Sequence, residues 1–86
     1  MAKPYLVHVW WVDSCTMNGW RHLSEMPDAD MTTHCETVGW LLKKNDKELV
    51  VGGSVGDLDM PNAQANSIMV IPRVAVTKMR RIKENK

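Results

Sequence analysis

The chain has 86 residues, which is enough for one small domain covering residues 1–86 and too short for two. Its formal net charge of +1 conceals an asymmetry, because six of its eleven Lys and Arg residues follow position 72 and only one of its ten acids does. No stretch approaches the roughly twenty apolar residues of a membrane-spanning helix. The first residues also lack the apolar segment of a secretory signal. We therefore expect a cytoplasmic protein with no membrane partner, in which Cys15 and Cys35 are reduced.

Residues 5–12 read Tyr-Leu-Val-His-Val-Trp-Trp-Val and are rich in β-branched and aromatic types, which predicts the first strand. Successive residues of a strand point to opposite faces, so Trp10 and Trp11 should lie on opposite sides of it. One ring should fill the core, and the other should meet a second element or a partner. The pattern leaves open which ring does which, because the odd-numbered positions are at least as apolar as the even-numbered ones, which include His8.

Turn-forming residues dominate positions 13–30, where we expect at most two helical turns with Ser24 as a potential N-cap. A second strand over residues 33–43 and a third starting at position 48 should form a hairpin around the turn 44–47. The pair Gly52-Gly53 permits a bulge or bend in the third strand.

The composition of residues 56–66 predicts a long loop, and residues 67–71 predict the fourth strand. Pro72 interrupts that strand. After it, either a helix or a turn followed by a strand would suit the spacing of the apolar residues. We favour a turn at 73–76 and a last strand at 77–82, with a frayed basic end at 83–86.

The predicted order is a strand, a long irregular segment, a hairpin, a loop, a strand, an Ile-Pro-Arg turn and a final short strand. This layout resembles the SH3-like and Sm-like small β-barrels. The resemblance implies an all-β barrel of about five strands with one short helical insertion, and it carries no functional residues.

A second resemblance rests on the segments Trp11-Val12-Asp13-Ser14, Gly19-Trp20, Cys35-Glu36-Thr37-Val38-Gly39-Trp40-Leu41-Leu42 and Val70-Ile71-Pro72-Arg73. In these segments the chain resembles short uncharacterised proteins of bacteriophages and prophages. The resemblance implies a phage accessory protein that acts in the cytoplasm of the host cell. It implies no particular activity.

Cys15, His22, His34 and Cys35 are of the types that bind zinc, but their spacing is unsuitable. There is no Cys-x-x-Cys, and the adjacent His34 and Cys35 would point to opposite faces of a strand. Two buried thiols and surface histidines are the simpler interpretation. A Cys–His nucleophile would need an orienting third group that the sequence does not show. We expect no catalytic residue, no metal and no cofactor.

Basic and aromatic residues together provide the candidate binding site. Barrels that bind nucleic acid combine cations with exposed rings that stack on bases. The candidates are Trp11, Trp20, Arg73, Lys78, Arg80 and Arg81. In the competing interpretation, Trp20 closes the core and the arginines keep an edge strand soluble.

Three functions are compatible with these features. The first is a non-enzymatic accessory protein that binds a host protein, or another host macromolecule, or associates with itself. The second is a nucleic-acid-binding barrel that uses the basic C-terminal strand. The third is an oligomeric sponge for an anionic nucleotide near Gly52-Gly53-Ser54-Val55-Gly56, which lacks the Lys-Ser/Thr of a P-loop.

Overall fold

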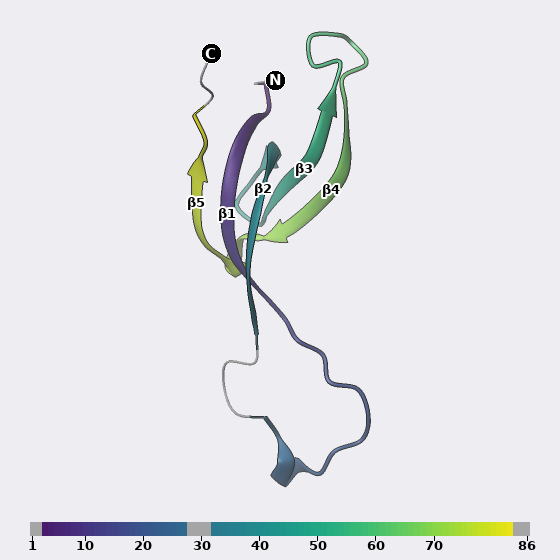
Figure 1. The fold of residues 1–86 in the computed structure, drawn as a ribbon, viewed down its shortest axis with the longest axis vertical. Coiled ribbons are helices and arrows are strands. Elements are labelled where there is room, and N and C mark those ends of the chain that lie inside the picture. The colour runs from purple at the N-terminus through teal and green to yellow at the C-terminus, as the bar shows by residue number, and fades with distance from the viewer. Residues whose placement is uncertain (1–2, 28–31, 84–86) are drawn as a thin grey trace.

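The computed structural model describes residues 3–27 and 32–83. Within these ranges, five strands form one antiparallel sheet in the order β4-β3-β2-β1-β5 (Figure 1). The strands are β1 (Tyr5–Asp13), β2 (Thr33–Lys44), β3 (Glu48–Gly56), β4 (Gln64–Pro72) and β5 (Val76–Arg81), joined in part by the 3-10 turns η1 (Leu23–Glu25) and η2 (Arg73–Ala75). The prediction of an all-β fold with five strands is confirmed.

The sheet is open. β4 and β5 form its two edges, and no ladder joins them within the described residues, so barrel closure is not confirmed. The strands nevertheless bend strongly (Figure 1). As a result, the hydroxyl of Thr37 on β2 reaches the sulfur of Met69 on β4 at 4.0 Å, although β3 lies between these strands in the sheet. The face that carries Thr37 and Met69 is therefore concave.

The core fills this concave face. Its buried side chains come from alternate positions of four strands, as expected for a sheet with one covered face. They are Val7, Val9, Leu41, Leu49, Val51 and Ile71. Because Val7 and Val9 point inward, Trp11 also does, and it packs against the core. Trp10 lies on the opposite, convex face, which resolves the question that the sequence left open.

The hairpin of β2 and β3 forms as predicted, and a side chain builds its turn. The side-chain oxygen of Asn45 accepts hydrogen bonds from the backbone amides of Lys47 (2.9 Å) and Glu48 (2.8 Å). Asn stabilises turns in this way because its short side chain replaces a backbone acceptor. The register shifts between Leu41 and Lys43, so an irregularity in β2 precedes the turn.

A glycine permits a close approach of the two strands in this hairpin. Gly39 is buried, and a Cβ atom at this position would lie 2.7 Å from the carbonyl oxygen of Gly52 and 2.7 Å from Cγ1 of Val51. Real Cβ atoms do not approach backbone so closely, so only glycine allows β3 to pass here.

Two local predictions differ from the structure, and a third is close to it. β4 begins at Gln64 instead of position 67, because pairing with β3 extends through residues of turn composition. Ser24 lies inside η1 and does not cap it; His22 precedes the turn, without a side-chain cap. η2 and β5 match the turn and strand predicted after Pro72 to within one residue. Residues 28–30 of the turn-rich segment and 84–86 of the predicted frayed end lie outside the described residues.

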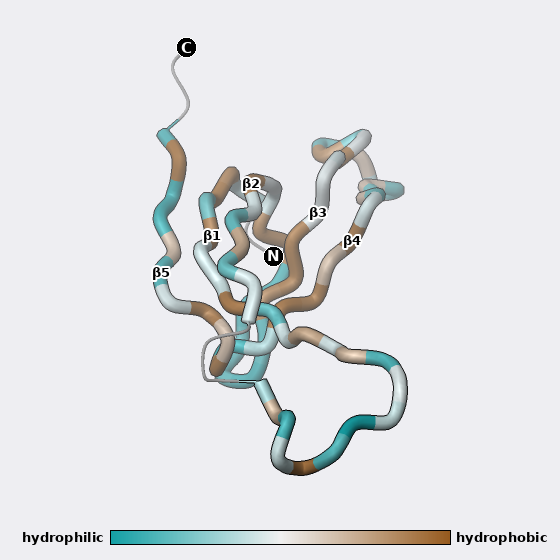
Figure 2. Tube along the Cα trace, turned by 60° about the horizontal axis from the view of Figure 1, so that its bottom comes forward, coloured by the Kyte–Doolittle hydropathy of each residue, from teal (hydrophilic) through white to brown (hydrophobic). Residues whose placement is uncertain are grey.

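Residues 14–27, here called the arm, leave the sheet as a long loop between β1 and β2 (Figures 1 and 2). The radius of gyration is 17.0 Å, whereas a compact chain of this length would have about 12 Å. The accessible surface is 7146 Å² for a mass of 9.8 kDa, against about 5,200 Å² for a compact monomer of that mass. The molecule thus exposes much more surface than its size requires.

Candidate functional site

The arm exposes apolar side chains that the sheet does not cover. Trp20 is fully exposed (104 %) and Leu23 nearly so (86 %), and Met17 and Met26 are also exposed. These four residues recur at every third position. A folded chain rarely leaves a whole indole in water, and exposed apolar groups of this size mark interaction sites. The interpretation in which Trp20 closes the core is wrong.

The base of the arm adjoins the tryptophan pair. The Asp13 carboxylate accepts a hydrogen bond from the Ser14 amide at 2.8 Å, where the chain leaves β1. A hollow of about 120 Å³ lies beside the tryptophan pair. It is too small for most ligands. Its lining residues are Trp10, Trp11, His34, Cys35, Glu36 and Thr77. Cys35 is half-buried, but Cys15 is exposed on the arm, so the expectation of two buried thiols is wrong for Cys15.

Trp11 forms part of the wall of the core. Its ring packs against the buried cluster on the concave face. Its indole N–H donates a hydrogen bond to Oγ1 of Thr37 at 2.9 Å. A ring that is packed on one side and bonded through its only polar group stabilises the fold, and it presents little free surface for stacking on a ligand.

Trp10 lies among polar partners on the convex face. The His8 ring stacks on it with a centroid separation of 3.6 Å and an interplanar angle of 16°. Lys78 places its ammonium 4.8 Å from the ring centroid, a cation–π contact from β5. Nε2 of His8 in turn donates to the Glu36 carboxylate at 2.9 Å. This convex cluster therefore contains a cation and a carboxylate, and its rings already contact each other.

The other basic candidates are dispersed. Arg80 pairs with His8 across β1 and β5, so it shares the convex face with Lys78, as the alternation predicts. Arg81 lies on the concave side, with its guanidinium 4.1 Å from the Tyr5 ring centroid. Arg73 donates to the carbonyl of Asn45 at 3.1 Å and holds the β2–β3 turn. The structure does not bring the six predicted site residues together.

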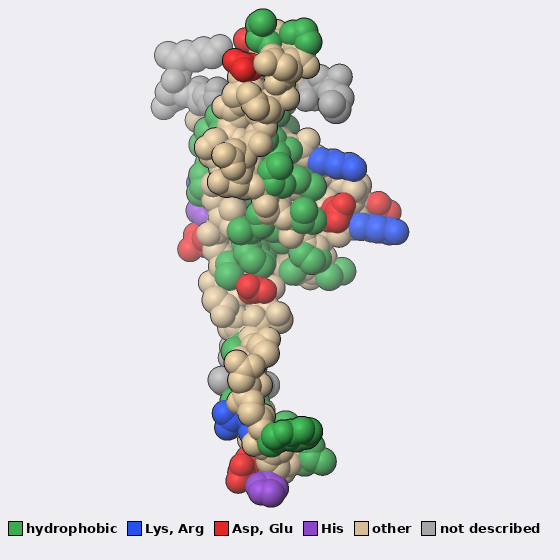
Figure 3. Space-filling view, turned by 90° about the vertical axis from the view of Figure 1, so that its right-hand side faces the viewer, with side chains coloured by type: hydrophobic (Ala, Val, Ile, Leu, Met, Phe, Trp, Pro, Cys, Tyr) green, Lys and Arg blue, Asp and Glu red, His purple; other side chains and the backbone are tan. Residues whose placement is uncertain are grey.

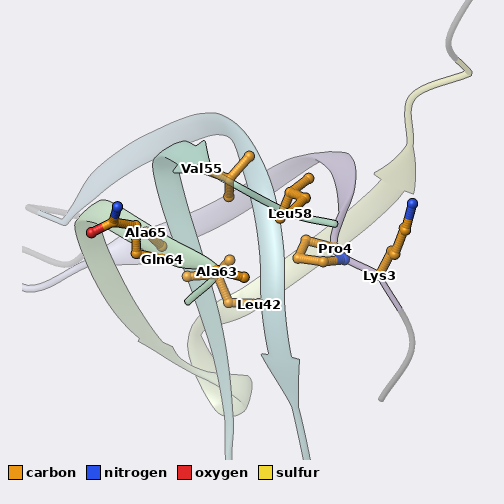
Figure 4. Close-up of a pocket in the computed structure, with 8 residues that line it drawn as sticks. All are labelled: Lys3, Pro4, Leu42, Val55, Leu58, Ala63, Gln64 and Ala65. Carbon is orange, nitrogen blue, oxygen red and sulfur yellow. The ribbon is translucent and has the colours of Figure 1, made fainter. Parts of the chain in front are cut away.

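One apolar pocket opens at the end of the sheet where β3 meets β4 (Figure 4). Its volume is about 320 Å³, at the lower end of the range for small-molecule sites. The lining consists of Lys3, Pro4, Leu42, Val55, Leu58, Ala63, Gln64 and Ala65. The Lys3 ammonium is paired with the Asp59 carboxylate, so the cation that an anionic ligand would need already has a partner.

The described residues contain no cluster of three or more His, Cys, Asp or Glu side chains placed to hold a metal ion. Within the same part of the chain, no helical segment has the length and apolar content to cross a membrane.

Comparison with protein families, with curated proteins and with solved structures finds no match for this chain. The resemblance to phage proteins therefore stays a prediction.

The apolar side chains of the arm are the features that sequence reasoning missed, apart from Trp20. Their signal was the three-residue spacing of Met17, Trp20, Leu23 and Met26 within a segment of turn composition. A loop made only to connect two strands has no need for four large apolar residues. Trp10 was missed as the partner of Lys78 because the alternation in β1 did not show which face was covered.

Proposed function

We propose that this chain is a non-enzymatic accessory protein of the phage type, which binds a host protein through the arm. The fully exposed side chain of Trp20 is the observation that carries the proposal. Tryptophan is enriched among the few residues that dominate the binding energy of protein interfaces. An indole that the described residues leave uncovered supplies such an anchor.

The neighbours of Trp20 make the arm suited to a protein surface. Leu23 lies three residues further on and is nearly as exposed, and two methionines flank the pair. Burial of an exposed leucine side chain contributes about 1.5–3 kcal/mol, and the larger indole adds to this. Methionine adapts to irregular apolar surfaces because its side chain is unbranched and flexible. Such a segment favours an apolar groove on a folded partner.

Nucleic-acid binding is the second candidate, and the contact of Lys78 with Trp10 favours it, with Arg80 on the same convex face. Two observations weigh against it. Glu36 adds a negative charge to the same cluster, and Arg73 and Arg81 contact groups elsewhere in the chain. This function therefore has fewer cations available than the sequence indicated.

The nucleotide sponge has less support. The pocket near Val55 and Gly56 is lined mainly by apolar side chains, and its cation is already paired with Asp59. We also propose that the sheet closes into an SH3-like or Sm-like barrel and that the protein acts in the host cytoplasm.

The test is retention of bacterial proteins by the immobilised chain, compared among three forms. We expect the native chain and a Lys78→Ala/Arg80→Ala variant to retain the same protein in 0.15 M and about 0.5 M salt, because apolar contacts are not screened. Trp20→Ala should lose at least nine-tenths of that retention. Circular dichroism checks that each variant is folded.

Two results would contradict the arm as the binding site. One is retention by Trp20→Ala equal to that of the native chain. The other is retention that disappears in high salt, after nuclease treatment or in the Lys78→Ala/Arg80→Ala variant, which would favour the nucleic-acid function.

A further inference from the structure

β4 is an edge strand whose outer backbone groups can be assigned. The Arg73 amide donates to the carbonyl of Lys47 at 2.9 Å, so these two residues form a hydrogen-bonded pair. Hydrogen-bonded and non-bonded pairs alternate along an antiparallel ladder. The pairs Val50–Val70 and Gly52–Ile68 are then non-bonded. The N–H and C=O groups of Ile68 and Val70 consequently point away from β3, toward the open edge.

An independent contact supports this assignment. The Asn45 amide donates to the carbonyl of Glu48 at 3.1 Å, so the backbone groups of Glu48 point toward β2. Val50 and Gly52 lie two and four residues further along β3 and point the same way. Their partners on β4 therefore receive no ladder bonds from β3, and two amides and two carbonyls of Ile68 and Val70 are available to another strand.

The side chains of β4 leave this edge unprotected. None of its nine residues is charged, and Ile68 (58 %), Val70 (56 %) and Met69 (40 %) are exposed. Seen from this side, the molecule shows hydrophobic side chains spread over the sheet with few charges among them (Figure 3). Natural edge strands usually carry lysine or another charge that prevents pairing with further chains. An uncharged edge of this kind indicates a strand that is paired in the working protein.

The opposite edge shows the contrast. β5 carries Lys78, Arg80 and Arg81 within six residues. Two copies of β5 placed side by side would bring like charges together, which is destabilising. Of the two edges, only β4 can pair with its own copy without repulsion.

We propose that β4 pairs with β4 of a second copy of this chain, antiparallel about a two-fold axis beside Met69. In this register Ile68 lies opposite Val70 of the partner, and Val70 opposite its Ile68. Both residues have free outward groups, so the pairing forms four backbone hydrogen bonds. Two Ile–Val pairs then form on the convex face, and the two Met69 residues face each other as a non-bonded pair.

The limits of the free edge favour a second copy as the occupant. Ser67 has a φ of +55° and interrupts regular pairing on one side, and Pro72, which has no N–H, ends the donors on the other. The segment between Ser67 and Pro72 can pair with its own copy about Met69, because Ile68 and Val70 then lie opposite each other. Two-fold dimers use the same patch on both subunits in this way.

The test combines charge insertion with a position-specific cross-link. We expect sedimentation of the native chain between about 1 µM and 1 mM to show a monomer–dimer equilibrium. Val70→Lys should weaken it about tenfold or more, since the two-fold axis brings both new charges to one short interface. The matched control is Val38→Lys, which alters an equally exposed valine (59 %) on the inner strand β2 and should leave dimerisation unchanged.

The cross-link reports the register directly and does not depend on the folding of the lysine variants. Facing residues of a non-bonded pair have Cα atoms about 4.5 Å apart, within the range of a disulfide. In a Cys15→Ser/Cys35→Ser background, Met69→Cys should form a covalent dimer on mild oxidation, and Val38→Cys should not. A native chain that stays monomeric at 1 mM, equal effects of both lysines, or a dimer that Met69→Cys does not cross-link would overturn the proposal. Trp20→Ala should dimerise normally, so failure of the arm as a binding site is a separate result.

Discussion

The sheet and the arm use the same kind of residue for opposite purposes. In the sheet, Trp11 packs against the core and its N–H is bonded to Thr37, so its burial stabilises the fold. In the arm, Trp20 is fully exposed, so it contributes no burial among the described residues. Apolar content alone therefore does not identify core. The two tryptophans differ in their surroundings. Strand pairing of β1 brings other apolar side chains into contact with Trp11, whereas residues 14–27 lie in no strand that would do the same for Trp20.

Truncation of a core side chain should give the largest effect and confirm that stability resides in the sheet. Leu49 is 1 % exposed and lies within the cluster formed by β1 to β4. We expect Leu49→Ala to lower the free energy of unfolding by about 2–5 kcal/mol, through lost transfer energy and the remaining cavity. Chemical denaturation measures this value. A loss below 1 kcal/mol would show that the concave face is not the core.

A protein of this size has a total stability of about 5–15 kcal/mol or less, so Leu49→Ala can abolish folding. Ile71→Val is the milder control, because Ile71 is fully buried and the change removes one methylene. It should cost about 0.5–1.5 kcal/mol and leave a folded protein on which the loss can be measured.

The second largest effect on stability should come from Gly39, where β2 and β3 approach closely. Gly39→Ala places a Cβ 2.7 Å from the Gly52 carbonyl oxygen, which is backbone and cannot move aside alone. We expect a loss of about 1–3 kcal/mol from this overpacking. Gly56→Ala is the matched control. Gly56 lies in β3 of the same hairpin, and a Cβ there would meet only Cγ of Gln64 at 3.7 Å. Equal midpoints of thermal unfolding for the two variants would contradict the proposed role of Gly39.

Much of the sheet could be predicted from the sequence, because local patterns determine it. The β-branched and aromatic run of β1 and the Asn45 turn between β2 and β3 are recognisable within a few residues. The start of β4 could not be predicted, because residues 64–66 have turn composition and become a strand only through pairing with β3. Closure of the sheet could not be predicted either, because β4 and β5 follow each other in the sequence and yet form its two opposite edges.

The site was less predictable than the fold for a physical reason. Lys78 and Arg80 lie on one face of β5 and Arg81 on the other, as the alternation of side chains along any strand requires. Alternation along β1 did not show which tryptophan faces the core, because both faces of that strand are apolar. Exposure of Trp20 could not be predicted from composition, because loops of the same composition fold back over a sheet in some proteins and leave it in others.

The smallest effect on stability is the sharpest test of the comparison between sheet and arm. Trp20→Ala removes the largest side-chain type from the chain but no contact with the sheet, so the free energy of unfolding should change by less than about 0.5 kcal/mol. Trp11→Ala removes the same group from the core wall and leaves the Thr37 hydroxyl without its donor, so it should cost about 2 kcal/mol or more. Urea denaturation followed by circular dichroism measures both without relying on tryptophan fluorescence. If Trp20→Ala destabilises the isolated chain as much as Trp11→Ala does, the arm must fold back onto the sheet in solution. Trp20 would then be a core residue, and the binding role proposed for the arm would lose its main support.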